Sequence, residues 1–466
     1  MTYNIKNPVA LIFFILVLCK LYSQDTLINS ESYTDGLLFE ATFSEDSIIS
    51  SYVFEEDSLQ IGIRVDSILS RADDSIAESL YMCFLMDNLC SELVKARIEF
   101  TTDTTALNKY GYSPDSIPVW SDSVYEARIH ELDMQTPIDL FFNKDIKQYI
   151  NVYAVKRREL TSKVLGLAEI YFPIFEETLD KYNMPYELKY LPIVESALNP
   201  TAGSRAGAKG LWQFMYGTGK LYGLHQTSYV DDRFDPYKST EAACLHLKDL
   251  YNIYDDWLLA LAAYNSGTGN VNKAIRRAGG KKNYWLVWPY LPRETRGYVP
   301  AFSAIIYIMN YAAEHNIYPM EPLLLAHETD TVVVHEVVSF EQINEVIGTD
   351  MELIKFLNPA YKLGVIPATE KNPYVIKLPT QDILKFVSDP QKVFCYKTKS
   401  GITREKMLQD IKKASEAQIH VVKKGETLGY IAKTYNTTVS KLMTWNNMKN
   451  TSLKIGQKII VYPGNK

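Results

Sequence analysis

A single glutamate, Glu195, stands in an otherwise apolar part of the stretch YELKYLPIVESALNP (residues 186–200). Leu188 and Leu191 lie seven and four residues before it, and Leu198 lies three residues after it. These spacings place side chains on one face of an α-helix. The sequence therefore predicts a carboxyl group on the face that the helix buries, with an ordinary ion pair at a helix end as the alternative.

The segment after this glutamate, TAGSRAGAKGLWQFM (201–215), has three glycines within eight residues and then an apolar cluster with one amide, Gln213. Glycines allow the backbone to approach a ligand closely. An apolar cluster can shield an acid from water, and burial disfavours the charged form of a carboxyl group, so its pKa rises. A general acid for glycosidic bond cleavage needs such a proton near neutral pH. The cluster consists of Leu211, Trp212, Phe214 and Met215.

A second segment, WLLALAAYNSGTGNV (257–271), combines a helical stripe with polar groups at its end. Trp257, Leu261 and Tyr264 fall on one helical face, and Asn265 follows directly, before a glycine turn. A tyrosine beside an asparagine at such an opening suits contact with a sugar. Packing of Tyr264 in the core is an equally open interpretation.

A third segment, LPRETRGYVP (291–300), supplies Glu294, Arg296 and Tyr298. An internal Glu–Arg ion pair that holds a loop is the simplest interpretation. Glycoside hydrolysis usually takes two carboxyl groups, and the aspartates of DDRFDP (231–236) are further candidates. Their spacing beside an arginine and a proline favours a structured turn, with Asp235 as a helix cap.

Five motifs occur in order: ES at 195, S at 204, GLWQFM at 210–215, AYNSG at 263–267 and ETRGYV at 294–299. Together they resemble the motif set of the lytic transglycosylases with a goose-lysozyme-like domain, over roughly residues 130–325. The resemblance implies a mainly α, lysozyme-like catalytic domain with Glu195 as the single catalytic acid and base. The other residues implied at the site are Ser204, Gln213 and Met215 near the N-acetylmuramoyl unit, Tyr264 and Asn265 beside the glutamate, and Glu294 and Tyr298 in the motif that closes the cleft.

The resemblance also implies a reaction on peptidoglycan. Glu195 would protonate the β-1,4 oxygen that leaves N-acetylmuramic acid, while the acetamido group of the substrate stabilises the developing positive charge. The ionised glutamate would then deprotonate the C6 hydroxyl, which attacks C1 and gives a 1,6-anhydro product; the nucleophile gains from its proximity. A hydrolytic muramidase or chitinase on the same fold and a non-catalytic wall-binding scaffold are the alternatives.

The elements that must position these segments are helices. From residue 121 to 325 the apolar pattern is overwhelmingly helical, with long runs at 154–182, 239–254 and 300–315 that clusters of Gly and Pro separate. We therefore expect one all-α domain over 121–325.

Beyond residue 326 the pattern changes to a strand–helix–helix–strand order that occurs twice. DTVVVHEVV (330–338) and YVIKLP (374–379) are typical of strands and enclose two helical patterns. We expect a small α+β (βααβ) module at 326–380, a linker at 381–417, and a second copy of the module at 418–464. The fold class is thus a multidomain chain with a helical catalytic domain followed by two small modules.

The second copy resembles a LysM module through VVKKGETLGYIAKTYNTTVSKLMTWN and LKIGQKIIVYP. The resemblance implies a shallow groove for N-acetylglucosamine units, which would tether the enzyme to its polymer. A spacer domain without binding is the alternative. The first copy lacks the KGETL opening and so departs from the pattern associated with sugar binding. The residues implied at the groove are Gly425, Glu426, Thr427, Leu428 and Asn446.

The 466-residue chain is 47% hydrophobic and 22% charged, which allows several folded cores and excludes global disorder. The formal net charge of −6 is spread unevenly. Residues 25–100 carry 16 acidic and 4 basic residues, whereas residues 411–466 carry 10 lysines and 2 glutamates. The basic end favours an anionic polymer as partner, with a solvated lysine-rich surface as the alternative. No phosphate-binding loop, redox motif or nucleic-acid motif occurs in the sequence.

Residues 1–23 are typical of an export signal, with Lys6, then an apolar run, then Ser23 before the predicted cleavage site. Lipid attachment at Cys19 is the alternative. The sequence thus predicts an exported protein, periplasmic or associated with the outer membrane of a Gram-negative-type bacterium. Residues 24–120 form an acidic region with a helical pattern at 76–100, and disorder is expected in part of it.

The cysteines are scattered singly. Cleavage of the signal would leave Cys83, Cys90, Cys244 and Cys395, which form no disulfide framework, and no CxxC or HxxxH pattern indicates a metal site. We therefore expect no structural metal, no cofactor and no required disulfide.

Overall fold

The computed structural model describes residues 100–101, 108–322, 328–416, 418–446, 448 and 450–461. The predicted export signal, the alternative lipid site at Cys19, and Cys83 and Cys90 lie outside these residues, as does the helical pattern at 76–100 except for its last residue, Phe100. None of the described helices combines the length and the apolar character needed to cross a membrane.

Residues 122–315 form the helical domain that the apolar pattern predicts, so the fold class is confirmed for this part of the chain. The three long predicted runs correspond to α7, α10 and α14, and a π-helical turn precedes α7. The helices are α5 (Asp122–Asp133), α6 (Lys144–Asn151), α7 (Arg158–Lys181), α8 (Leu191–Ser196), α9 (Tyr216–Leu221), α10 (Pro236–Tyr254), α11 (Trp257–Ser266), α12 (Thr268–Arg277), α13 (Tyr284–Val287) and α14 (Arg293–Tyr311). Short strands β1 (Phe100–Thr101) and β2 (Glu321–Pro322) pair antiparallel.

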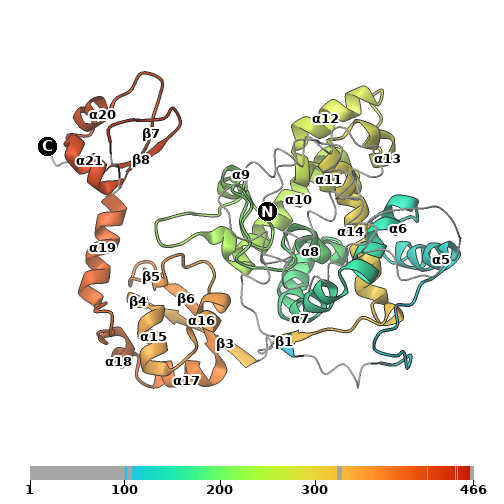
Figure 1. The fold of residues 1–466 in the computed structure, drawn as a ribbon, viewed down its shortest axis with the longest axis horizontal. Helices are drawn as coiled ribbons and strands as arrows, with labels where there is room; N and C mark the ends of the chain where they lie inside the picture. The colour runs from blue at the N-terminus through green and yellow to red at the C-terminus, as the bar shows by residue number, and fades with distance from the viewer. Residues whose placement is uncertain are drawn as a thin grey trace, which may run out of the picture. The chain divides into compact units, whose positions relative to one another are not determined.

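The core of this domain is built around α11, which packs against α10, α12 and α14 (Figure 1). All six residues from Leu258 to Ala263 are buried, as expected for a helix that is apolar on every side. Asp256 caps the helix by accepting a hydrogen bond from the Leu259 N–H at 2.9 Å. Because the body of α11 is fixed in this way, the polar residues at its C-terminal end are held in place too.

The first small module has the predicted strand–helix–helix–strand order. Strand β3 (Thr329–Val334) pairs antiparallel with β6 (Tyr374–Pro379), and a short pair, β4 (Val338–Ser339) with β5 (Val365–Ile366), lies beside it in the chain. The two helices between the strands are α15 (Phe340–Ile347) and α16 (Met351–Leu357).

The predicted linker over 381–417 is wrong in its first part. Helices α17 (Thr380–Ser388) and α18 (Pro390–Phe394) place Ile383, Phe386 and Val393 in the core of the first module, which therefore extends beyond residue 380. Helix α19 (Arg404–Glu416) follows. The apolar periodicity of these short helices was too brief to separate them from connecting chain.

The second module repeats the order with β7 (Gln418–Val421), α20 (Leu428–Thr434), α21 (Val439–Trp445) and β8 (Lys458–Val461). One asparagine plays the same part in both copies. Asn358 donates to the carbonyls of Ile354 and Lys377 and accepts from the Lys377 N–H, and Asn446 does the same with Leu442 and Ile460. Each asparagine thus ties the second helix of its module to the closing strand.

Candidate active site

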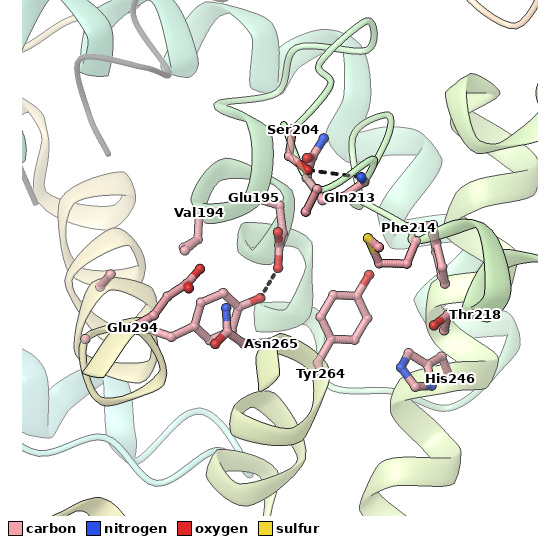
Figure 2. A pocket seen from close by; sticks show the side chains of 16 residues that line it. Val194, Glu195, Ser204, Gln213, Phe214, Thr218, His246, Tyr264, Asn265 and Glu294 are labelled. Atoms are coloured by element: carbon pink, nitrogen blue, oxygen red, sulfur yellow. Dashed lines mark hydrogen bonds between the residues drawn. The ribbon is translucent and has the colours of Figure 1, made fainter. Parts of the chain in front are cut away.

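A cavity of about 420 Å³ opens in the helical domain, and all eight residues predicted for the catalytic site line it (Figure 2). They come from four places in the chain: the end of α8, the glycine-rich loop after it, the end of α11 and the first turns of α14. The eight are Glu195, Ser204, Gln213, Met215, Tyr264, Asn265, Glu294 and Tyr298.

The stretch that carries Glu195 is not one continuous α-helix, so this prediction is wrong. A 3-10 turn over Tyr186–Tyr190 leads into the six-residue helix α8, and Ala197 and Leu198 then adopt left-handed backbone conformations, with φ of 49° and 59°. Such φ values are unfavourable for residues with a side chain and often mark functional sites. The leucines at 188, 191 and 198 are nevertheless fully buried, as predicted. The sharp turn ends the helix at Ser196, one residue after the acid, and Glu195 lines the cavity.

Glu195 is held in a state that suits a proton donor. Burial raises the pKa of its carboxyl group from the ordinary value of 4.5 to about 7, the hydroxyl of Tyr298 opposes this rise by donating a hydrogen bond to Oε1, and the negative charge of Glu294 adds to it. At neutral pH a large fraction of the group therefore keeps its proton, and the ionised form that follows proton transfer already has a donor in place.

Tyr298 reaches Glu195 because α14 packs closely against α6. The side chain is 6% exposed and points from the second turn of the helix into the cavity. Gly297 precedes it, and a Cβ at that position would collide with the hydroxyl of Tyr149 from α6. The glycine of the ETRGYV motif thus permits the close packing of α6 and α14, while Glu294 in the first turn of α14 also lines the cavity.

Tyr264 and Asn265 join the end of α11 to the other walls. Tyr264 Oη donates to the carbonyl of Trp212 at 2.7 Å, and Asn265 Oδ1 accepts from Thr295 Oγ1 at 2.9 Å. Burial, and then the charge of Glu195, raise the pKa of Tyr264 well above its ordinary value, so the phenol stays protonated. Since Asn265 uses its carbonyl oxygen within the protein, its Nδ2 group is the one available to a ligand.

The glycine-rich loop is pinned by a buried ion pair. Arg233 donates to both carboxylate oxygens of Asp231, at 2.9 and 2.8 Å, and to the carbonyls of Gly207 and Phe214 at 3.0 and 3.2 Å. Gly210 has φ of 78°, and a Cβ there would collide with the Arg233 carbonyl. The interpretation of DDRFDP as a structured turn is confirmed, and Asp235 caps α10. Its aspartates do not line the cavity.

Two polar side chains of the loop, Ser204 and Gln213, make hydrogen bonds within the loop itself. Ser204 Oγ accepts from the Ala208 N–H at 3.0 Å, and Gln213, with φ of 47°, donates from Nε2 to the Gly210 carbonyl at 2.8 Å. The apolar cluster that the sequence predicts around the acid lines the cavity only in part. Phe214 and Met215 line the cavity, whereas Leu211 and Trp212 are fully buried in the core.

Several cavity residues were missed by the sequence analysis. Thr218 of α9 and His246 of α10 are the polar ones, and Val194, Ala206, Ala208 and Ala301 are the apolar ones. His246 lies 51 residues after Glu195 in a helix whose pattern indicated only core packing, so no local signal linked it to the site.

In the second module most of the implied groove residues build the fold itself. Leu428 is 2% exposed and belongs to the core, which makes its side chain inaccessible and corrects that part of the prediction. Thr427 caps α20 by accepting from the Tyr430 N–H, and Asn446 ties α21 to β8. Gly425 has φ of 88°, which a tight turn requires.

Within the described ranges no group of three or more His, Cys, Asp and Glu side chains is arranged to hold a metal ion.

Comparisons with known proteins follow the same division of the chain. Residues 172–287 match the transglycosylase SLT domain family, residues 328–392 match the LysM-like domain of lytic transglycosylase MltD, and residues 420–461 match the LysM domain family. The SLT match ends before α14, so Glu294 and Tyr298 lie beyond it.

Membrane-bound lytic murein transglycosylase D of Escherichia coli K12 is 32% identical over 300 residues, which cover 64% of this chain and 64% of the relative. The chain thus spans less than two thirds of that relative's length. The soluble lytic murein transglycosylase of the same strain is 32% identical over 111 residues, 22% of this chain and 17% of the relative. Among solved structures, the 70 kDa soluble lytic transglycosylase of Escherichia coli covers 53% of this chain and 37% of its own at 20% identity, with a TM-score of 0.30.

The matched families occur in the order SLT domain, MltD-type LysM-like domain and LysM domain. With this domain content and the identity over 300 residues, the chain is similar to lytic murein transglycosylase D in its SLT-type segment and its two LysM-type segments.

Proposed function

We propose that this chain is a peptidoglycan lytic transglycosylase. It cleaves the β-1,4 bond between N-acetylmuramic acid and N-acetylglucosamine and forms 1,6-anhydro-N-acetylmuramic acid ends. The observation that carries the proposal is Glu195, a buried carboxyl group with a pKa of about 7 in a cavity large enough for sugar rings. The relatives named lytic murein transglycosylases support it.

The reaction needs one group to act twice. Glu195 gives its proton to the glycosidic oxygen while the C1–O bond breaks, and the acetamido oxygen of the same sugar bonds to C1. The Glu195 carboxylate then takes the proton of the C6 hydroxyl as O6 bonds to C1 and the bond between C1 and the acetamido oxygen breaks. No water is consumed, and Glu195 ends protonated as it began.

The surroundings of Glu195 support both halves of this cycle. Burial favours the protonated form before the first transfer, and the Tyr298 hydroxyl stabilises the carboxylate between the two transfers. The attacking hydroxyl belongs to the same sugar, so its effective concentration is high. Gln213, Asn265 and Ser204 supply polar groups that can hold the sugar in position.

A hydrolytic muramidase is the second candidate, because Glu294 also lines the cavity and could direct a water molecule. Digestion of purified sacculi followed by mass spectrometry separates the two. Anhydro products, each one water lighter than the hydrolytic ones, are expected. Products of the hydrolytic mass would overturn the transglycosylase proposal, and no release at all would indicate a non-catalytic scaffold.

We also propose that the module at residues 418–461 binds the glycan and that the protein is exported to the periplasm or the outer membrane. The match to the LysM family supports the first proposal, and the membrane-bound relative supports the second. Cell fractionation with an antibody tests the location: recovery with envelope fractions is expected, and recovery with cytosol would contradict it.

A further inference from the structure

His246 is a cavity residue that the proposed reaction does not use. It comes from α10, across the cavity from the loop that carries Ser204, and lies near Thr218 and Tyr264 (Figure 2). Its ring lies 5.2 Å from that of Tyr264 and 4.9 Å from that of Tyr222, between centroids, so aromatic neighbours fix the plane of the imidazole. The side chain is part-buried, with one edge open to the cavity.

A chain of hydrogen bonds behind the imidazole determines which nitrogen carries the proton. Tyr222 Oη donates to Asp249 Oδ2 at 2.9 Å and lies 3.1 Å from His246 Nδ1. A phenol has one proton to donate, and Tyr222 uses it in the hydrogen bond to the carboxylate of Asp249. The contact with His246 is therefore a hydrogen bond only if Nδ1 carries a hydrogen and donates to Tyr222.

The other nitrogen is consequently an acceptor. Burial lowers the pKa of His246 to about 4, so the ring is neutral near pH 7. A neutral imidazole with a proton on Nδ1 has a bare lone pair on Nε2. Among the hydrogen bonds of the described residues none involves Nε2 of His246, and the ring lines the cavity.

We propose that His246 orients the substrate by accepting, at Nε2, a hydrogen bond from a hydroxyl or amide N–H group of the bound glycan, with Tyr222 and Asp249 as positioning residues that fix the tautomer. This inference rests on the proposed function and adds a contact that recognises a donor group. An acceptor in a partly desolvated cavity favours ligands that carry a donor, because a ligand without one leaves the acceptor unpaired.

The binding test uses the Glu195→Gln protein, which cannot turn over the ligand, and a soluble tetramer of N-acetylglucosamine as the probe, by calorimetry. His246→Leu is expected to weaken binding about three- to tenfold, the effect of losing one neutral hydrogen bond. Tyr222→Phe is expected to weaken it as well, although Tyr222 does not line the cavity. His225→Leu, at an exposed histidine outside the cavity lining, is the matched control and should bind normally.

Two further readouts separate orientation from a merely structural effect. Nitrogen-15 NMR of the folded protein should show His246 with a protonated Nδ1 and a bare Nε2, and Tyr222→Phe should move the proton toward Nε2. The double variant should bind no more weakly than His246→Leu alone, because both changes remove the same contact.

Unchanged tetramer affinity in His246→Leu, a proton found on Nε2 in the unmodified ring, or no tetramer binding to the Glu195→Gln protein would each overturn the inference. The mass of the products released from sacculi by the unmodified enzyme tests the proposed reaction separately. In that assay His246→Leu should raise KM by a larger factor than it lowers kcat.

Discussion

Two glutamates of this chain, Glu195 in the cavity and Glu426 in the C-terminal module, have the same side chain in opposite surroundings. Burial raises the pKa of Glu195 to about 7. Glu426 accepts from the backbone N–H of Lys423 at 2.7 Å and lies 2.7 Å from His420 Nε2, and these contacts lower its pKa. His420 Nδ1 in turn lies 3.1 Å from the hydroxyl of Tyr435.

The difference shows how the surroundings of a carboxyl group decide its role. Glu195 is buried and has one hydrogen-bond donor, so its proton is available for transfer. Glu426 is supplied with donors, so it stays ionised and holds the first turn of the module to its opening strand. The first we expect to act in chemistry, the second in stabilising the fold.

The largest effect is expected from removing the acid. Glu195→Gln should lower anhydromuropeptide release from sacculi by about a thousandfold or more, because the amide has no proton to transfer at neutral pH. Glu177→Gln, at an exposed position of α7, and Glu426→Gln are the controls and should retain turnover of soluble fragments. Normal release of anhydromuropeptides by Glu195→Gln would show that Glu195 is not the catalytic acid.

The same substitution should stabilise the protein at high pH. The Glu195 carboxyl group has a pKa of 4.5 in the unfolded chain and about 7 in the folded protein. As pH rises between these values, the free energy of unfolding of the protein therefore falls by about 3 kcal/mol in total. The free energy of unfolding of Glu195→Gln, measured with urea, should therefore rise by about 3 kcal/mol relative to that of the unmodified protein between pH 4 and pH 8. A difference that does not change with pH would show that folding does not shift the pKa of Glu195.

Tyr298→Phe should move the pH profile in a defined direction. The Tyr298 hydroxyl stabilises the ionised form of Glu195 and so lowers its pKa. Without it the alkaline limb of kcat/KM, which falls as Glu195 loses its proton near pH 7, should shift upward by about one pH unit. Tyr186→Phe, at an exposed tyrosine, should leave the profile unchanged, and a downward shift in Tyr298→Phe would contradict the assignment.

Deletion of residues 411–466 should separate attachment from chemistry. The shortened protein should sediment several-fold less with insoluble peptidoglycan, because tethering raises the local substrate concentration, while its turnover of soluble fragments stays close to that of the full chain. Undiminished sedimentation would indicate that the module is a spacer.

The smallest effect is expected from Glu426→Gln. Its pKa is lowered in the folded state, so its stabilising contribution is present above the unfolded pKa and is lost as pH falls. The variant should show faster amide hydrogen exchange over residues 418–461 at pH 7 than the unmodified protein, and a smaller difference at pH 4. Equal exchange at both values would mean that the His420 and Lys423 contacts do not stabilise the module.

Periodicity in the sequence alone indicated the helical segment and the repeated strand–helix–helix–strand module, because periodicity is a local property of the chain. The resemblance of its motifs to a known family implied eight of the residues that line the cavity. The prediction from the sequence erred where short segments were decided by packing. The run at 186–198 breaks after Glu195 because two residues turn left-handed, and residues 380–394 join the core of the first module.

Only the tertiary structure decided which groups surround each of these residues. Tyr298 donates a hydrogen bond to Glu195, which lies 103 residues earlier in the chain. His246 lines the cavity, and we infer that its contact with Tyr222, which in turn donates to Asp249, fixes its tautomer. Desolvation and hydrogen-bond partners depend on neighbours that are distant in sequence, and they fix the pKa and the free lone pairs of each side chain. Residue type and spacing named the candidates, and folding determined which of them holds a proton and which accepts one.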